Sequence, residues 1–197
     1  FPYTTLFRSI MGTKIRRPDL DIDLILGSNQ DLMKKLSEGG VDAVVMAMPA
    51  SGLPEGIQVI HLFEDELYFA LSKNNKSKQN EIDLSEYRNE KFLTLQDGFA
   101  TTSGFYEAFQ LAGFAPNVVM KVGDIFSLMN MVSSDMGMTL LPGRVRALMG
   151  DAIEFTPLAP KYRVVQHIAL MYLQANESNP NILALAAEAR MLHRNNP

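Results

Sequence analysis

The chain has 197 residues, of which 47% are hydrophobic and 20% charged, so it can bury a substantial core and is not a disordered tail. Its net charge of −4 argues against binding of nucleic acid phosphates by this chain alone. The absence of cysteine excludes disulfides and cysteine-ligated metals, and no apolar run approaches the roughly 20 residues that span a bilayer. We therefore expect no membrane partner.

The first nine residues, FPYTTLFRS, resemble the translation of a sequencing adapter joined in frame to a genuine reading frame. We interpret residues 1–9 as such an artefact and leave them out of the fold prediction. On this interpretation, the native segment that preceded residue 10 is lost. Residues 10–17 are then the last turns of a helix, because the residue before Pro18 avoids the helical region.

The next stretch is predicted to form a strand, a helix and a second strand. Apolar residues dominate 20–26, which is typical of a strand buried on both faces of a parallel sheet. Ser28 can cap the following helix, with Asp31 completing a capping-box pattern. A glycine pair ends that helix, and residues 43–48 form the second strand. Such a unit is parallel, and it presents the amides at the helix start to a ligand.

Two short strands, 57–63 and 66–71, are predicted to follow, joined by Glu64-Asp65. After a polar connection and a strand at 92–95, the opening pattern repeats: a turn, and then hydroxyl side chains at the start of a helix. The remaining predicted elements, in chain order, are a helix after residue 101, a strand at 118–122, a helix capped by Asp124, a strand at 138–141, a short helix at 144–149, strands at 155–158 and 164–173, and a helix at 180–194.

The best candidate binding groups are the hydroxyls and amides at the helix starts. Ser28 and Asn29 belong to one lobe, and Thr101, Thr102 and Ser103 belong to the other. Two helix starts that face each other would form a pocket for a carboxylate or a similar anion, and Phe99 could cover an apolar part of the ligand. The alternative, that Ser28 and Asn29 only cap a structural helix, stays open.

The sequence shows no pattern for a metal, a nucleophile or a cofactor. His61 and His167 lie in apolar strand patterns and are predicted to be structural histidines with satisfied hydrogen bonds. There is no GxSxG motif and no phosphate-binding glycine loop. We therefore expect no cofactor, no metal and no catalytic residue, and we do not expect an enzyme.

Several short motifs occur in a particular order and spacing. They are Pro18-Asp19-Leu20, Gly27-Ser28-Asn29, LSEGGVD at 36–42, FEDEL at 63–67, GFAP at 113–116, Val122-Gly123-Asp124 and GMTLLP at 137–142. In this combination the chain resembles the effector-binding domain of LysR-type transcriptional regulators.

The resemblance implies an α/β, two-lobed fold like type 2 periplasmic binding proteins, with two strands crossing between the lobes. Lobe I would comprise 10–71 and 166–197, and lobe II 72–165, with a small, carboxylate-bearing effector in the cleft between them. The family also implies an N-terminal winged helix-turn-helix domain, which is missing here and through which alone the parent would contact DNA. The full-length parent would be a cytoplasmic homodimer or tetramer.

The family's ligand contacts carry over to Ser28, Asn29, Asp97, Gly98, Thr101 and Asp124. The stretches 124–126 and 141–144 are similar to those of regulators of malonate use, which implies a dicarboxylate such as malonate. Two alternatives share this fold: a periplasmic solute-binding receptor of a transporter, and an enzyme. The native sequence upstream of residue 10 would distinguish the first alternative, because a receptor would have a signal peptide there and a regulator a helix-turn-helix.

Overall fold

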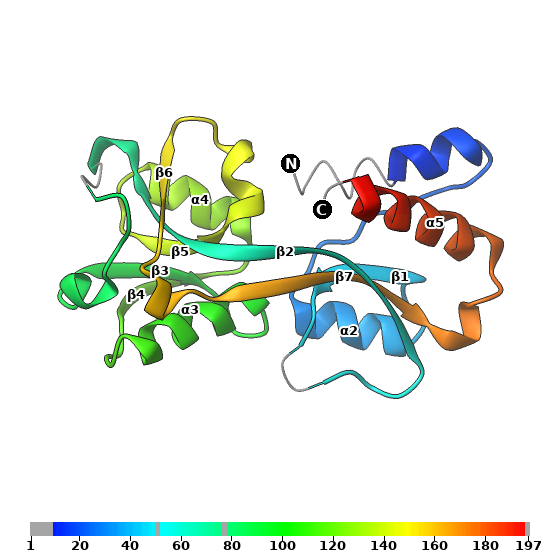
Figure 1. Cartoon of the computed structure of the whole chain (residues 1–197), viewed down its shortest axis with the longest axis horizontal. Coiled ribbons are helices and arrows are strands. Elements are labelled where there is room, and N and C mark those ends of the chain that lie inside the picture. The colour runs from blue at the N-terminus through cyan, green and yellow to red at the C-terminus, as the bar shows by residue number, and fades with distance from the viewer. Residues whose placement is uncertain (1–9, 50–51, 76–78, 196–197) are drawn as a thin grey trace. The chain divides into compact units, whose positions relative to one another are not determined.

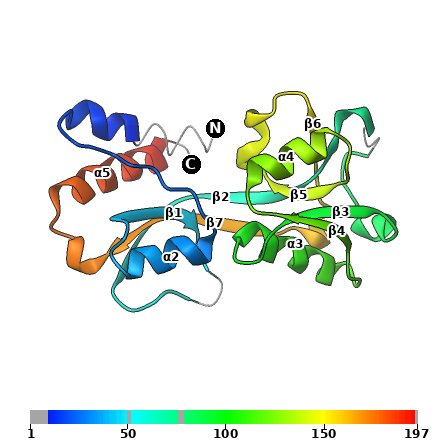
Figure 2. The ribbon, with the colours of Figure 1, turned by 180° about the vertical axis from the view of Figure 1, so that it is seen from behind.

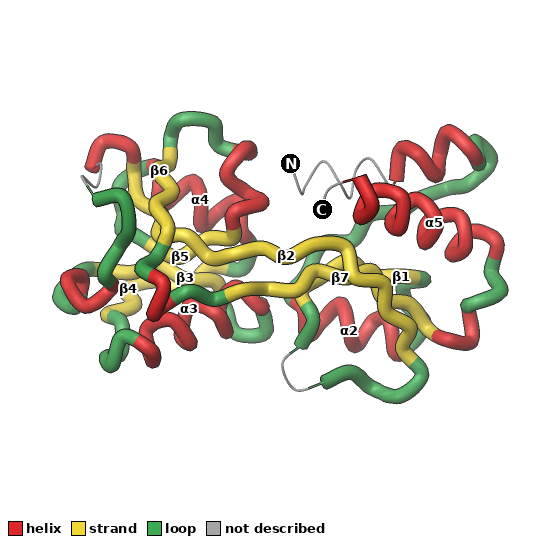
Figure 3. Tube along the Cα trace, viewed as in Figure 1, coloured by secondary structure: helices red, strands yellow, loops and turns green. Residues whose placement is uncertain are grey.

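The computed structural model describes residues 10–49, 52–75 and 79–195, and the nine residues interpreted as an adapter lie outside that part (Figure 1). The chain divides into two compact units. Unit 1 comprises Phe1–Glu64 and His167–Pro197, and unit 2 comprises Asp65–Gln166. Both boundaries fall inside long strands, β2 (Ile57–Ser72) and β7 (Val165–Leu173) (Figure 3). Two strands therefore pass from one unit to the other, as predicted.

Unit 1 is a small sheet with a helix on each face. Its elements are a helix at residues 10–16, α2 (Asn29–Ser37), β1 (Ala43–Ala47), parts of β2 and β7, η5 (Gln174–Asn176) and α5 (Pro180–Asn195). β1 pairs antiparallel with β7, and α2 and α5 lie on opposite faces of these strands (Figures 1 and 2). Leu170 and Tyr172 pack with α5, whereas Ala169 and Met171 pack with α2. Burial on both faces explains the unbroken apolar run in β7.

The predicted strand at 20–26 is wrong. Leu24 is 58% exposed and Leu26 is 78% exposed, so the segment is not buried on either face. A strand needs the backbone of a neighbour, and within the described ranges residues 21–27 make no recorded backbone hydrogen bond. The parallel strand–helix–strand unit is therefore absent as well, because β1 takes its pairing from β7, which runs antiparallel.

The predicted break at Glu64-Asp65 is also wrong, because β2 runs unbroken through both residues. Two adjacent carboxylates suggested a turn, but the strand's alternation continues across them: Glu64 is exposed and Asp65 is buried. The burial of Asp65 depends on a salt bridge with Arg144, and that partner is far away in the sequence. The sequence pattern around residue 65 could not reveal it.

Unit 2 contains a parallel pair of strands between two helices. Its elements are the rest of β2 and the start of β7, η1 (Lys73–Asn75), η2 (Leu84–Tyr87), β3 (Lys91–Leu95), α3 (Ala100–Leu111), β4 (Asn117–Val122), α4 (Ile125–Ser133), β5 (Thr139–Pro142), η3 (Gly143–Leu148), β6 (Ile153–Pro157) and η4 (Pro160–Tyr162). β3 and β4 are parallel, and both β5 and β6 pair antiparallel with β2. α3 and α4 cover opposite faces of β3 and β4 (Figures 1 and 2).

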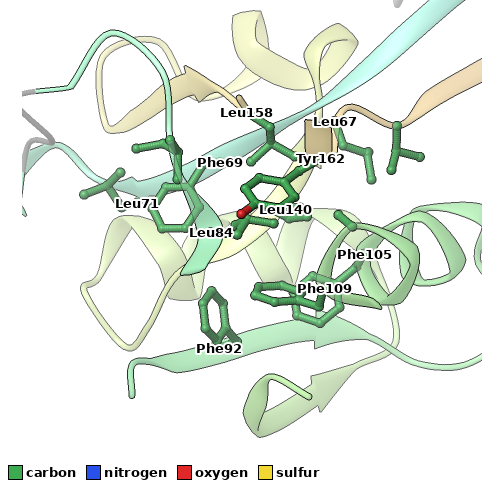
Figure 4. Packing of buried hydrophobic residues seen from close by; sticks show 13 residues of the cluster. Leu67, Phe69, Leu71, Leu84, Phe92, Phe105, Phe109, Leu140, Leu158 and Tyr162 are labelled. Carbon is green, nitrogen blue, oxygen red and sulfur yellow. The ribbon is translucent and has the colours of Figure 1, made fainter. Parts of the chain in front are cut away.

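The core of unit 2 combines aliphatic and aromatic side chains, as Figure 4 shows. Phe92 of β3 meets Phe109 of α3 at 4.7 Å between ring centroids, and Phe105 lies 4.8 Å from Phe109. All three rings are fully buried and meet in edge-on or tilted geometry, which suits the ring quadrupoles. This cluster fixes α3 against β3, and so fixes where the start of α3 lies.

Candidate functional site

Three strands of unit 2 end at one edge. Leu95, the last residue of β3, is in register with Val122, the last residue of β4, and the Gln96 amide donates to the Val122 carbonyl at 2.8 Å. A parallel bridge between Phe92 and Met138 places the entry to β5 beside β3, so β5 ends at this edge too. We call it the carboxyl edge of unit 2. Open α/β sheets bind ligands at such an edge, because helices start there.

The turn after β3 leads into α3. Gly98 has a φ of 94°, a left-handed conformation that favours glycine, and Phe99 is the N-cap without a side-chain capping bond. The Thr102 hydroxyl, which is buried, lies 3.2 Å from the Leu95 carbonyl and 3.0 Å from the Gln96 carbonyl. Thr102 thus ties the helix start to the end of β3.

Thr101 differs from its neighbour. Its side chain is 6% exposed, and no hydrogen bond to its hydroxyl is recorded among the described residues. The hydroxyl oxygen is not among the fully buried side-chain atoms that lack a partner, so it is reachable from solvent although the residue is mostly covered. Thr101 is therefore the side chain at this helix start with a hydrogen bond still to offer.

Two carboxylates flank the same edge. Asp124 caps α4 and accepts from the Ser127 hydroxyl at 2.6 Å and from the Ser127 amide at 2.9 Å, which lowers the pKa of Asp124. Asp97 is exposed and pairs with Lys121 at 3.0 Å, which raises the pKa of Lys121. Both carboxylates already have donors, so each suits a ligand hydroxyl better than a ligand anion.

Ser28 and Asn29 lie in unit 1. The Ser28 hydroxyl caps α2 by accepting from the Asp31 amide at 3.1 Å, and it donates to the Asp31 carboxylate at 2.7 Å. The Asn29 side-chain amide donates to the Ala47 carbonyl at 3.1 Å. The predicted Ser28 cap is confirmed. Both side chains make hydrogen bonds that stabilise the local structure. The structure thus gathers Asp97, Gly98, Phe99, Thr101, Thr102 and Asp124 on one edge of unit 2 and places the other two residues in unit 1.

Sequence reasoning missed a polar cluster at the end of β5. The Arg144 guanidinium donates through Nη1 to Asp65 Oδ2 at 2.8 Å and to Gln166 Oε1 at 3.3 Å. Asp65 and Gln166 are 7% and 6% exposed, so both are buried. The only sequence signal was the position of Arg144 directly after a predicted strand that ends in Pro142-Gly143.

The prediction for the histidines is wrong. His61 and His167 are both exposed, and the His167 ring lies 3.3 Å from Glu64. They occupy the outward positions of β2 and β7, where an apolar run misled the interpretation. No group of acidic, histidine or cysteine side chains that could hold a metal occurs in the part of the chain that is described. Within the same part, no helix has the length and apolar character needed to cross a bilayer.

A shallow hollow lies at the far end of α3 from this edge. It is lined by Tyr106, Gln110, Gly113, Phe114, Ala115, Pro116, Asn117 and Val118. These residues carry no charge and no buried donor, so the hollow lacks the groups that would select an anion. The carboxyl edge of unit 2 is chemically the better site.

Comparison with known proteins decides the family. Residues 4–193 match the family described as the LysR substrate binding domain. The chain belongs to this family. A LysR relative, the malonate utilization transcriptional regulator of Klebsiella pneumoniae, is 39% identical over 192 residues, which cover 96% of this chain and 62% of that protein. The LysR domain described here thus spans less than two thirds of that relative.

Solved structures show the same fold for this LysR domain. The effector-binding domain of QuiR in complex with shikimate has a TM-score of 0.82 at 17% identity and covers 98% of this chain and 91% of its own. Full-length CbnR complexed with its target DNA has a TM-score of 0.75 at 15% identity, over 94% of this chain and 65% of its own. The predicted fold class, a two-lobed α/β effector-binding domain, is confirmed.

Proposed function

We propose that this chain is the effector-sensing domain of a cytoplasmic transcription regulator whose DNA contacts are made by a separate N-terminal domain. The parent would act as a homodimer or tetramer on DNA. The relatives support this, since the reported ones are a malonate utilization regulator, an effector domain with shikimate, and a regulator on DNA. A symmetric assembly reads two half-sites, so effector binding acts by changing how the effector domains pair.

The effector is a small carboxylate, with a dicarboxylate such as malonate as the first candidate. The observation behind this is the Thr101 hydroxyl at the start of α3, which belongs to a largely buried residue and has no recorded partner among the described residues. Backbone amides at a helix start favour an anion, and a hydroxyl beside them adds a directed donor. Thr101 and the amides at the start of α3 would bind the carboxylate, and Phe99 would cover the ligand's apolar part.

Thermal denaturation of the chain with a panel of ligands tests the proposal. The panel is malonate, succinate, shikimate and the neutral malonamide, each at millimolar concentration. A ligand that binds only the folded state raises Tm, so at least one carboxylate should raise Tm while malonamide does not. No shift with any carboxylate would contradict the proposal.

Two matched variants locate the binding group. Thr101→Val should abolish the Tm shift, whereas Thr139→Val should leave the shift unchanged. Thr139 is also buried in unit 2 and its hydroxyl has no partner there, but it lies at the start of β5, at the other end of the strand from the carboxyl edge. Equal shifts in both variants would remove Thr101 from the site.

A further inference from the structure

Three of the five guanidinium N–H donors of Arg144 are unused among the described residues. Its side chain is 20% exposed, and its recorded side-chain contacts, to Asp65 and Gln166, both use Nη1. Its backbone amide also donates to Asp65 Oδ2, at 3.3 Å. Among the described residues no partner is recorded for Nε or Nη2. A guanidinium offers five N–H donors in a fixed plane, so three remain available.

The unused donors form one edge of the guanidinium. Nε–H and one Nη2–H point the same way, in the fork that binds a carboxylate through two parallel hydrogen bonds. The two hydrogen bonds from Nη1 fix the orientation of the guanidinium plane, because their acceptors, Asp65 and Gln166, are buried. An arginine held in this way loses little further freedom when an anion binds.

The position of Arg144 matches the proposed effector site. It is the second residue after β5, whose last residue ends at the carboxyl edge of unit 2. Thr101 and the start of α3 lie at that same edge, after β3. The edge therefore has one cation with a free fork beside a helix start that itself favours anions.

We propose that Arg144 binds a carboxylate of the effector through its Nε–Nη2 edge and makes the domain selective for carboxylates over neutral analogues. This rests on the proposed function and names the residue that sets ligand class. Asp65 and Gln166 are the first and last residues of unit 2, so each lies where a crossing strand enters or leaves it. A ligand that binds Arg144 thus contacts a guanidinium that is hydrogen-bonded to residues of both β2 and β7.

Titration calorimetry with malonate and malonamide tests the assignment, using the chain and its variants. Arg144→Gln should weaken malonate binding about 10- to 100-fold, as expected for loss of a charge-assisted bidentate pair, while malonamide should give no binding heat with either protein. Arg144→Lys should recover part of the loss, because a point charge remains without the fork. If malonate gives no heat, succinate and shikimate serve as the carboxylate probes.

Arg146→Gln is the matched control. Arg146 lies on the same short helix, η3, but its guanidinium stacks over Tyr68 and Phe155 and donates to the Phe155 carbonyl. This variant removes the same charge and should bind malonate within about twofold of the unmodified chain.

Arg144→Gln also leaves Asp65 buried without its cation, which could unfold the chain. The double variant Asp65→Asn/Arg144→Gln removes both charges, and it too should have lost malonate affinity if the proposal holds. Folded single or double variants that bind malonate as tightly as the unmodified chain would overturn the role of Arg144 and leave the proposed function intact. Failure of the unmodified chain to bind any carboxylate probe would overturn both.

Discussion

Asp83 shows how one carboxylate joins segments that are far apart in the chain. Its oxygens accept from the Lys161 ammonium and the Tyr162 hydroxyl, both at 2.8 Å, and from Ser85 at the start of η2. Hydrogen bonds from Lys161, Ser85 and Tyr162 lower the pKa of Asp83 well below its ordinary value. Asp83 thus fastens the first turn of η2 to η4, beside the aromatic core.

A depressed pKa makes stability depend on pH in a definite direction. The folded state binds the Asp83 proton more weakly than the unfolded state, so the stabilisation is complete above the unfolded pKa of 3.8 and is lost as pH falls toward the folded pKa. The chain should therefore be more stable than Asp83→Asn at neutral pH, and the difference in Tm should shrink below about pH 4. Thermal denaturation across this range measures it.

Glu81→Gln is the control for this effect. Glu81 is exposed, and no ion pair is recorded for it in the described part of the chain, so its variant should not show the trend. A Tm difference between the chain and Asp83→Asn that stays constant down to pH 2 would contradict the explanation.

Residues whose interaction partners lie within a few positions in the chain could be predicted from the sequence. Ser28 and Asp124 were both predicted to cap helices, and both do, because a cap and its helix are adjacent in the chain. Arg144 and Asp65 were not predicted as a pair, because they are 79 positions apart and meet only through the pairing of β2 with β5. The candidate site was therefore half predicted: its helix starts were found and its cation was not.

At the scale of elements, the hydrophobic pattern predicted a strand correctly where another strand was present to pair with it. The buried runs in β1, β3 and β7 became strands because each pairs with another strand. Residues 20–26 are also rich in apolar side chains, yet they form no strand, since no described residue pairs with them. Pattern predicts that a segment can be a strand, and pairing decides whether it becomes one.

Two leucines in unit 1 test this difference directly. Leu36 of α2 is fully buried, so Leu36→Ala should cost about 2–5 kcal/mol of unfolding free energy. Leu26 is 78% exposed, so Leu26→Ala should change that free energy by no more than about 0.5 kcal/mol. Denaturant unfolding of both variants compares them, and equal losses would show that residues 20–26 are packed.

Gly104 sets how closely α3 approaches β2. A Cβ at this position would lie 2.8 Å from Leu67 Cδ1, closer than real Cβ contacts, and 3.1 Å from Val164 Cγ1, a tight contact, so both side chains would have to shift. Gly104→Ala should therefore destabilise the chain by about 1–2 kcal/mol, although alanine favours helix.

Ser103→Ala, at an exposed position of the same helix, should be neutral in the same unfolding experiment. Stabilisation by Gly104→Ala equal to that of an ordinary exposed glycine-to-alanine change would contradict the close approach.

At the scale of the whole molecule, two crossing strands join two units that each have a core of their own. The fold class followed from the order of motifs along the chain, and the match over residues 4–193 confirms it. The proposed ligand-binding edge lies within unit 2 and follows from the order of its strands.

Amide chemical shifts of the isotope-labelled chain, recorded with and without saturating malonate, test that claim most directly. Succinate or shikimate is used if malonate does not bind. The account predicts that the largest shifts fall at Gln96–Thr102, Gly123–Asp124 and Gly143–Arg144, the ends of three parallel strands. Shifts centred instead on the hollow around Tyr106 and Phe114, with the carboxyl edge unchanged, would contradict it.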